Sequence, residues 1–290
     1  MKKAAVCTNV YSDPGFIYTD MVCSVLEKHG IDWGVFTVDP TPKDTLCHGR
    51  AFTTLSGALK GAGIIICLGG DGTILHIAEP AARRRIPVLG INLGHRGFMT
   101  ELARDDMDGL ESILQNGFEC YERMMAHVCV MRGDKCVYSA DALNDAVITK
   151  GVEARIIDMS VYADGVLVSE FSGDGIVVCT PTGSTAYSMS AGGPIVEPEA
   201  ENLIITPVCS HSLKAKSFVL SPGRKVSVAI GELKNYRSAF ISADGGRAKR
   251  LEDGDIVSVC RSQYKLRLVK ADKDSFYNKV YIKLNTSRSR

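Results

Sequence analysis

The chain has 290 residues, which is enough for one large domain or for two domains of ordinary size. Hydrophobic residues make up 45% of it and charged residues 23%, and the 34 Lys and Arg nearly balance the 33 Asp and Glu. A formal net charge of +1 argues against the dense basic surface that nucleic-acid binding requires, so we expect no nucleic-acid partner.

Neither a membrane span nor a signal peptide is expected. The N-terminus has a basic start but too few apolar residues for a secretion signal, and no stretch approaches the ~20 apolar residues that cross a bilayer. The ten cysteines include no C-x-x-C pair, and half of them lie in apolar, strand-like runs. We therefore expect a cytoplasmic protein without membrane contact, whose cysteines stay reduced.

The first third of the chain alternates between expected strands and helices. The run Ile64–Leu68 is apolar throughout, as in strands that are buried on both faces of a parallel sheet. Strands are expected at 4–10, 33–38, 64–68 and 86–91, and helices at 16–28, 55–60 and 74–82. This alternation predicts an α/β domain with a doubly wound parallel sheet over residues 1–116.

After about residue 116 the pattern changes to short, β-branched runs. Several of them alternate apolar and polar residues, and Asp-Gly pairs that favour turns separate them. The clearest runs are 127–131, 156–162, 225–230 and 256–260. They predict an all-β, sandwich-like domain over residues 117–270. The last run, Phe276–Leu284, fits a strand or a helix, and residues 271–290 could return to the first domain.

A glycine-rich turn follows the apolar strand: Gly69-Gly70-Asp71-Gly72-Thr73. Ligands of parallel sheets bind beyond the carboxyl ends of the strands, and glycines let backbone N–H groups approach phosphate oxygens. The turn is neither a Walker A loop nor a dinucleotide fingerprint, because no lysine follows it and the G-x-G-x-x-G spacing is absent. It predicts a phosphate-binding loop that includes Gly69, Gly70 and Thr73, and hence a small-molecule kinase.

Asp71 is the unusual member of this turn. Two unit charges 4 Å apart repel by about 4 kcal/mol at an effective dielectric of 20, so a carboxylate beside phosphates needs a cation to bridge or a proton to accept. Asp71 could therefore be the general base for phosphorylation of a hydroxyl group. The alternative is a tight turn in which Asp71 caps the following helix. The pattern leaves both interpretations open and somewhat favours the first.

A second unusual run extends from Thr180 to Pro194. It combines hydroxyl groups, glycines and Tyr187 with little hydrophobic periodicity, and a core element would not carry so many polar groups that need partners. The run predicts a pocket wall that bonds ribose and amide groups, with Tyr187 as a stacking face; a Ser-rich surface loop is the alternative. A hydrolase is not supported, because Gly183-Ser184-Thr185 does not complete a G-x-S-x-G elbow.

Together these segments resemble the ATP-NAD kinase family. The resemblance runs from about Ile64 to about Gly245, and its pieces occur in the family's order. They are the 69–73 turn, Asn92–Phe98, Leu143–Asp145, Thr180–Pro194, Pro207–Leu213 and Asp244-Gly245. The resemblance implies an α/β domain followed by a β-sandwich-like domain. It also implies transfer of phosphate from ATP to the 2′-hydroxyl of the adenosine ribose of NAD, which gives NADP and ADP.

The resemblance also implies roles for individual residues. Asp71 would be the general base, while Asn144 and Asp145 would hold the adenine and ribose. Asp174 and Ala186 would lie at the nicotinamide carboxamide end, and Asp244 would come from the same or a neighbouring subunit. The full set of implied NAD-binding residues is Gly72, His95, Phe98, Asn144, Asp145, Asp174, Thr185, Ala186, Tyr187, Ser190 and Asp244.

Partners and cofactors follow from the same resemblance. It implies NAD and ATP as substrates and a homodimer or homotetramer. No His or Cys cluster has the spacing of a metal site, so we expect no protein-held metal, and Mg²⁺ should arrive with ATP. Three positions depart from the family: Asp145 replaces a common Glu, Met99 replaces a frequent Tyr, and Lys216-Ser217 replaces Arg-Pro.

Two rival functions remain at this stage. A kinase with a lipid or sugar acceptor could share the glycine-Asp-glycine turn, but the Thr180–Pro194 run argues against it. A non-catalytic dinucleotide sensor could use the same scaffold, but binding alone gains nothing from the Asp71 carboxylate near phosphates. The sequence does not choose between ATP and polyphosphate as donor, or between NAD and NADH as acceptor.

Overall fold

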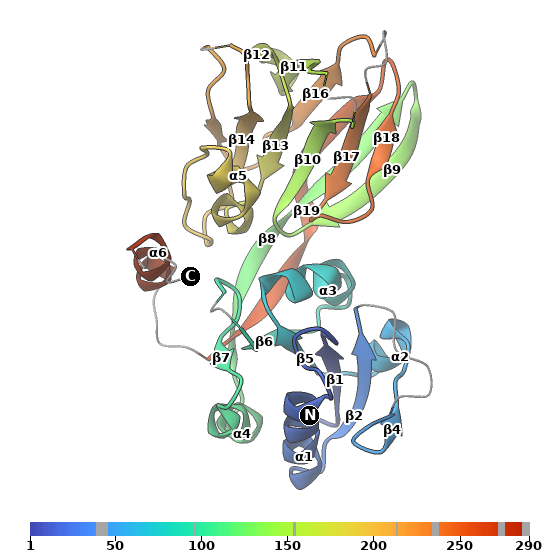
Figure 1. Ribbon diagram of the computed structural model, residues 1–290, viewed down its shortest axis with the longest axis vertical. Helices are drawn as coiled ribbons and strands as arrows, with labels where there is room; N and C mark the ends of the chain where they lie inside the picture. The colour runs from blue at the N-terminus through green and yellow to red at the C-terminus, as the bar shows by residue number, and fades with distance from the viewer. Residues whose placement is uncertain are drawn as a thin grey trace. The chain divides into compact units, whose positions relative to one another are not determined.

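A computed structural model of the chain describes residues 1–38, 46–94, 97–152, 155–212, 214–233, 238–271 and 276–285. They form two compact units: Met1–Glu122 with Leu266–Arg290, and Arg123–Lys265. The long strands β8 (Glu119–Arg132) and β19 (Ile256–Lys270) lead the chain from one unit into the other (Figure 1). Both strands continue without a break from one unit into the other, so no change of composition marks the boundary between the units. The boundaries expected from the sequence, at 116–117 and 270–271, differ from the observed ones by a few residues.

The first unit is built on a parallel sheet, as the alternation of strands and helices predicts. Its central strands pair side by side in the order β6-β5-β1-β2, and every one of these pairs is parallel. They are β1 (Lys3–Thr8), β2 (Asp32–Thr37), β5 (Ile64–Gly69) and β6 (Val88–Asn92). β7 (Leu102–Ala103) and the end of β19 also pair with β6, and β3 (Leu46–Cys47) and β4 (Arg50–Ala51) form a small hairpin.

Helices cover both faces of this sheet. α1 (Ile17–Lys28) and α4 (Met107–Asn116) share one hydrophobic core with the β1 and β5 side chains of one face. On the other face, Gly34 of β2 lies against Ala58 of α2 (Leu55–Leu59), and Gly90 of β6 lies against Ile74 of α3 (Asp71–Arg84). The doubly wound α/β fold expected from the sequence is therefore confirmed.

The last run of the chain, which the sequence left open between strand and helix, is a helix. α6 spans Phe276–Asn285 and belongs to the first unit. α4 and β7 were not expected from the sequence.

The second unit contains two antiparallel sheets, as the β-rich pattern predicts. One has the order β15-β14-β13-β10-β17-β18; the other contains β12-β11-β16-β19 together with β8 and β9. Alternate residues of both sheets, such as Ile148 and Met159, share a single core, so the sheets pack as a sandwich. The strand bounds are β9 (Lys135–Ala142), β10 (Asp145–Lys150), β11 (Ile157–Ala163), β12 (Val166–Gly173), β13 (Gly175–Cys179), β14 (Leu203–Val208), β15 (Phe218–Leu220), β16 (Val226–Ile230), β17 (Ala239–Ala243) and β18 (Lys249–Leu251).

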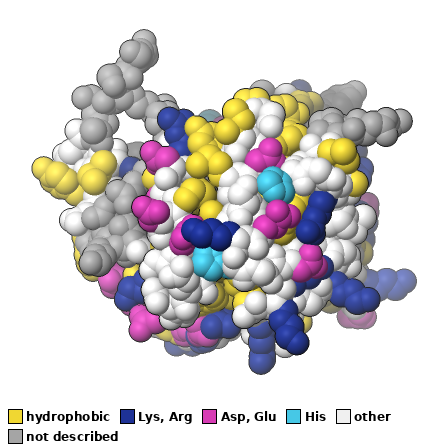
Figure 2. Space-filling model, turned by 90° about the horizontal axis from the view of Figure 1, so that it is seen from below, with side chains coloured by type: hydrophobic (Ala, Val, Ile, Leu, Met, Phe, Trp, Pro, Cys, Tyr) yellow, Lys and Arg dark blue, Asp and Glu magenta, His cyan; other side chains and the backbone are white. Residues whose placement is uncertain are grey.

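The face of the first unit that carries α1 and α4 is mixed in charge. Figure 2 shows acidic, basic and histidine side chains interspersed there rather than gathered by type. Lys28 bonds Glu111, and His48 lies between Asp20 and Glu27. Among the helices in the described part of the chain, none is both long and apolar enough to cross a membrane.

Candidate functional site

In the first unit, the glycine-rich turn joins a buried strand directly to a helix. β5 is buried along its whole length and ends at Gly69, whose φ of 153° and close approach to Thr73 leave no room for a Cβ atom. Gly70 is the N-cap of α3 and Asp71 its first residue. A Cβ at Gly70 or Gly72 would meet no other atom within 4 Å, so the turn is open to a ligand on this side. An open helix N-terminus flanked by glycines suits a phosphate group.

The Asp71 carboxylate faces a second loop instead of its own helix. Its Oδ2 accepts a hydrogen bond from the Phe98 N–H at 2.7 Å, and its Oδ1 accepts one from the Met99 N–H at 3.0 Å. A Cβ at Gly97 would overlap this carboxylate, so only glycine fits there. The alternative that Asp71 caps α3 is therefore wrong, since Gly70 is the N-cap and the Asp71 carboxylate bonds the 98–99 backbone. Two backbone donors fix the carboxylate, and each oxygen keeps a lone pair for another proton donor.

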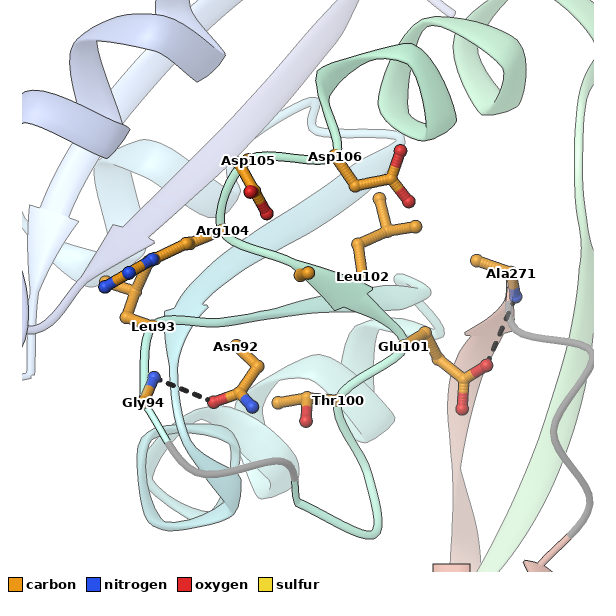
Figure 3. Close-up of a pocket in the computed structure, with 11 residues that line it drawn as sticks. Asn92, Leu93, Gly94, Thr100, Glu101, Leu102, Arg104, Asp105, Asp106 and Ala271 are labelled. Carbon is orange, nitrogen blue, oxygen red and sulfur yellow. Dashed lines mark hydrogen bonds between the residues drawn. The ribbon is translucent and has the colours of Figure 1, made fainter. Parts of the chain in front are cut away.

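A pocket of about 880 Å³ opens beside this loop, at the carboxyl end of β6. Figure 3 shows the Asn92 amide oxygen bonded to the Gly94 N–H and the Glu101 carboxylate turned toward Ala271. The other lining residues are Leu93, Thr100, Leu102, Ala103, Arg104, Asp105 and Asp106. Among the described residues, none of those predicted as site residues from the sequence lines this pocket.

In the second unit, Asp244 organises the segment that precedes β10. Its carboxylate accepts hydrogen bonds from the N–H groups of Leu143, Asn144 and Asp145, at 2.6, 2.7 and 3.1 Å. Asp244 has a φ of 48° and its own N–H bonds the Asp145 carbonyl at 3.0 Å. The structure thus places Asp244 beside Asn144 and Asp145 of the same chain, although Asp244 follows them by about a hundred residues.

The start of the Thr180–Pro194 run packs on the same segment. The Thr180 hydroxyl bonds the Leu143 carbonyl at 2.5 Å, and the Thr180 N–H bonds the Asn144 carbonyl at 2.8 Å. A Cβ at Gly183 would overlap the Asn144 carbonyl, which explains the glycine. The Ser-rich surface loop is therefore wrong for this part of the run, because Thr180 to Ser184 are buried.

Two buried polar atoms beside this contact have no partner in the described structure. They are the Asn144 Oδ1 and the Thr182 Oγ1. Buried polar atoms are nearly always bonded, to protein or to an ordered molecule. These atoms therefore indicate where a polar ligand or ordered water binds.

Asp145 has an unusual ionisation for an aspartate. Burial, and then the negative charge of Asp244, raise the pKa of Asp145 to about 7 from its ordinary 3.8. Only 5% of the residue is exposed. Near neutral pH its carboxyl group can therefore donate a proton in a hydrogen bond or accept one, whereas an ordinary aspartate only accepts.

This raised pKa makes stability depend on pH. Between pH 4 and 7 the folded state holds a proton on Asp145 that the unfolded state has released, so the free energy of unfolding falls as the pH rises, by about 1.4 kcal/mol per pH unit. Asp145→Asn should remove this slope. Urea denaturation followed by circular dichroism at pH 5, 6 and 7 measures the difference between the two proteins, and parallel curves would contradict the assignment. Circular dichroism is required because the one tryptophan, Trp33, lies in the other unit.

The remaining predicted residues of the run lie on short helices. Thr185 ends the 3-10 helix η1 (Thr182–Thr185), and Ala186 leads into α5 (Tyr187–Ser190). Tyr187 and Ser190 are exposed and lie three positions apart, so they share one face of α5. Tyr187, with 43% of its surface exposed, can offer its ring to a ligand.

Asp174 does not join the other predicted residues of this unit. It precedes β13, whose far end pairs with Asp145, so the length of the strand separates the two carboxylates. Its carboxylate bonds Lys150 Nζ at 2.6 Å. His95 lies outside the described residues. Sequence analysis missed Thr182 as a separate candidate, although it lies within a run already singled out for its hydroxyl groups.

An α/β unit with a glycine-rich turn at a helix N-terminus, followed by a β-sandwich, is the architecture expected from the sequence for a small-molecule kinase. Comparisons with known proteins specify the family. Residues 48–118 match the ATP-NAD kinase N-terminal domain, and residues 143–271 match the ATP-NAD kinase C-terminal domain. The chain is 35% identical over 285 residues to the NAD kinase of Ruminiclostridium cellulolyticum, covering 98% of both. It is 41% identical over 223 residues to the NAD kinase of Symbiobacterium thermophilum, covering 77% of this chain and 78% of that one.

Solved structures agree with this assignment. The NAD kinase of Archaeoglobus fulgidus in complex with ATP is 26% identical, with a TM-score of 0.75 over 97% of this chain and 98% of that chain. Yeast NADH kinase complexed with NADH shares the fold, with a TM-score of 0.82 at 22% identity over 100% of this chain and 89% of that chain. The chain belongs to the ATP-NAD kinase family, which confirms the resemblance found in its motifs.

Proposed function

We propose that this protein transfers the γ-phosphoryl group of ATP to the 2′-hydroxyl of the adenosine ribose of NAD, giving NADP and ADP. The observation that carries the choice of acceptor is the pair of buried, unpartnered oxygens on Thr182 and on Asn144, the residue before Asp145. These groups offer hydrogen bonds of the kind that an adenine amine and ribose hydroxyls require. The lipid acceptor is disfavoured, because a lipid would leave such groups unpaired.

Asp71 supplies the proposed chemistry. As the ribose oxygen attacks the γ-phosphorus, its O–H proton passes to the Asp71 carboxylate, an O–P bond forms, and the bond from the γ-phosphorus to the β-γ bridging oxygen breaks to release ADP. The Phe98 and Met99 N–H groups keep the carboxylate in one orientation. Holding the base in place saves the reorganisation that a mobile side chain would need at each turnover.

The glycine-rich turn is the proposed phosphate site. Gly70 and Gly72 leave the N-terminus of α3 open, so its positive dipole end can face phosphate oxygens. Mg²⁺ is proposed to enter as part of the MgATP substrate, since Mg²⁺ usually takes one or two protein carboxylates and completes its shell with phosphate oxygens and water.

The experiment that tests this function is a product assay. Purified protein is incubated with ATP, Mg²⁺ and NAD, and NADP is measured by its reduction with an NADP-specific dehydrogenase. We expect NADPH only when protein, ATP and NAD are all present. Replacing ATP by polyphosphate and NAD by NADH in separate reactions identifies the donor and acceptor. A folded protein that binds NAD in calorimetry but forms no NADP with any donor would instead be the dinucleotide sensor.

The oligomeric state stays a prediction. A homodimer or homotetramer is expected from the family, and light scattering on the purified protein measures it. A monomer at assay concentrations would show that the residues of one chain suffice for whatever activity is found.

A further inference from the structure

α6, at the C-terminal end of the described chain, carries a buried lysine. Lys279 is 6% exposed, and lysine is rarely buried unless it is paired. Its Nζ lies 3.1 Å from the Glu101 Oε1, and it also donates to the Thr100 carbonyl at 3.4 Å. The Glu101 side chain is itself only 8% exposed. A buried charge pair thus fastens α6 to a segment that precedes it by more than 170 residues.

Glu101 joins this helix to the end of the sheet. Its own N–H bonds the Gly90 carbonyl of β6 at 2.9 Å, and its Oε2 accepts the Ala271 N–H at 3.3 Å (Figure 3). The carboxylate therefore lies among β6, the residue that follows β19, and α6. Contacts with β6, Ala271 and Lys279 hold Glu101 in place, so removing the Lys279 ammonium group would remove one of these three contacts.

From Glu101 the contacts lead back to Asp71. The preceding residue, Thr100, is 2% exposed, and its hydroxyl accepts the Gly97 N–H at 3.2 Å. This bond closes the tight loop whose Phe98 and Met99 N–H groups hold the Asp71 carboxylate. Lys279 bonds the carbonyl of the same Thr100. The loop is therefore held at one end by Asp71 and at the other by the buried ion pair.

A second contact links α6 to the same loop. The Phe276 ring lies 6.1 Å from the Phe98 ring, and the Lys283 Nζ lies 4.1 Å from the centre of the Phe98 ring. These aromatic and cation–π contacts cover the side chain of the residue whose N–H binds Asp71. Residues near both ends of α6 thus contact Phe98 in the 97–101 loop.

We propose that Lys279 is a positioning residue for Asp71: by holding Thr100 and Glu101, it fixes the loop that orients the Asp71 carboxylate. This inference rests on the proposed role of Asp71 as the general base. Lys279 itself touches no reacting atom. A buried ion pair adds little net stability, because desolvation offsets its attraction, so its use here is to fix geometry.

The test separates positioning from stability. Lys279→Met retains an unbranched side chain as far as Cε but removes the terminal ammonium group, and with it the charge and the hydrogen-bond donors. We expect kcat to fall by roughly 10- to 100-fold while KM for NAD changes by less than about 3-fold, since a misplaced base affects the chemical step more than binding. All measurements are made at a temperature where circular dichroism shows the variant to be folded. A wild-type kcat would overturn the proposal.

A matched control is available in the same unit. The Lys3 Nζ also donates to two backbone carbonyls, those of Gly57 and Lys60, at 3.1 and 2.9 Å, but far along the sequence from the 97–101 loop. Lys3→Met should lower thermal stability and leave kcat unchanged. An equal kcat loss in both variants would show that any loosening of this unit slows the reaction, and would overturn the specific role of Lys279.

A double-mutant cycle tests whether Lys279 acts through Asp71. If it does, Lys279→Met should cause little further loss of kcat in a protein that already carries Asp71→Asn, measured with radiolabelled ATP. Losses that multiply in full would show an independent effect and contradict the proposal.

A second variant keeps the proposal testable if Lys279→Met does not fold. Glu101→Gln retains the size of the side chain and its acceptor for Ala271, and should lower kcat several-fold with little change in KM; a wild-type kcat in Glu101→Gln would then overturn the proposal. Failure of the underlying function is distinguishable, because in that case the wild-type protein itself would form no NADP.

Discussion

Asp71→Asn should lower the turnover number by about two to four orders of magnitude, because general base catalysis typically contributes ~10²–10⁴ in rate. An amide cannot accept the ribose proton, but it is close in size to the carboxylate, so the protein should fold and still bind NAD. The measurements are kcat in the product assay and NAD affinity by calorimetry. Unchanged turnover would rule out proton transfer to Asp71.

The Asp71→Asn substitution also changes the contact between residue 71 and the 97–99 loop. The Asp71 carboxylate accepts two N–H groups, and an asparagine amide can accept with only one of its two ends. Part of the loss could therefore come from a displaced 97–99 loop. Gly97→Ala isolates this part, because its Cβ would overlap the Asp71 carboxylate and disturb its contact with the loop, while the carboxylate keeps its charge and its ability to accept a proton. We expect a smaller loss of kcat in Gly97→Ala than in Asp71→Asn.

Asp244→Asn should abolish detectable NAD binding at millimolar concentrations and lower the free energy of unfolding by about 2–4 kcal/mol. The Asp244 carboxylate receives three converging N–H groups, and the amide that replaces it would leave at least one of these donors facing its own NH₂ group. A buried donor left unpaired costs about 1–3 kcal/mol, and the segment that carries Asn144 and Asp145 would shift. Calorimetry and urea denaturation measure the two effects.

Asp164→Asn is the matched control for this variant. Asp164 also precedes a glycine and has a φ of 49°, close to the 48° of Asp244, so any cost of asparagine in this conformation is shared. Its carboxylate accepts the Lys225 N–H and pairs with Arg224 at the surface. We expect NAD affinity to be unchanged and stability to fall much less than in Asp244→Asn, because water screens a surface ion pair. Equal effects of the two substitutions would show that the Asp244 contacts have no special role.

Local pattern was sufficient for most of the fold. An apolar run such as Ile64–Leu68 is typical of a strand covered on both faces, and its position between amphipathic segments favours a parallel sheet. The glycine at 69 likewise follows from chain geometry, because the turn from β5 into α3 needs a conformation and a close approach to Thr73 that other residues do not tolerate. The short β-branched runs after residue 116 predicted the sandwich for a similar reason.

The character of the Thr180–Pro194 run was also visible in advance. Hydroxyl groups in such density need partners, and the structure supplies some of them, as in the bond from Thr180 to the Leu143 carbonyl. It leaves Thr182 without one. Which hydroxyl groups are paired depends on residues from other strands, so the sequence could indicate a polar wall but could not say which of its atoms remain available.

The sequence by itself therefore determined the α/β and β-rich halves, the glycine-rich turn and the polar run. Each of these features depends on neighbouring residues and on the period of a helix or strand. Only the tertiary structure decided that Asp71 faces the 97–99 loop, that Asp244 lies beside Asn144, that Asp174 is separated from them by a strand, and that Phe276–Asn285 is a helix bound through Lys279. Each of these contacts joins residues that are distant in the chain, and no local pattern specifies which distant donor a carboxylate will meet.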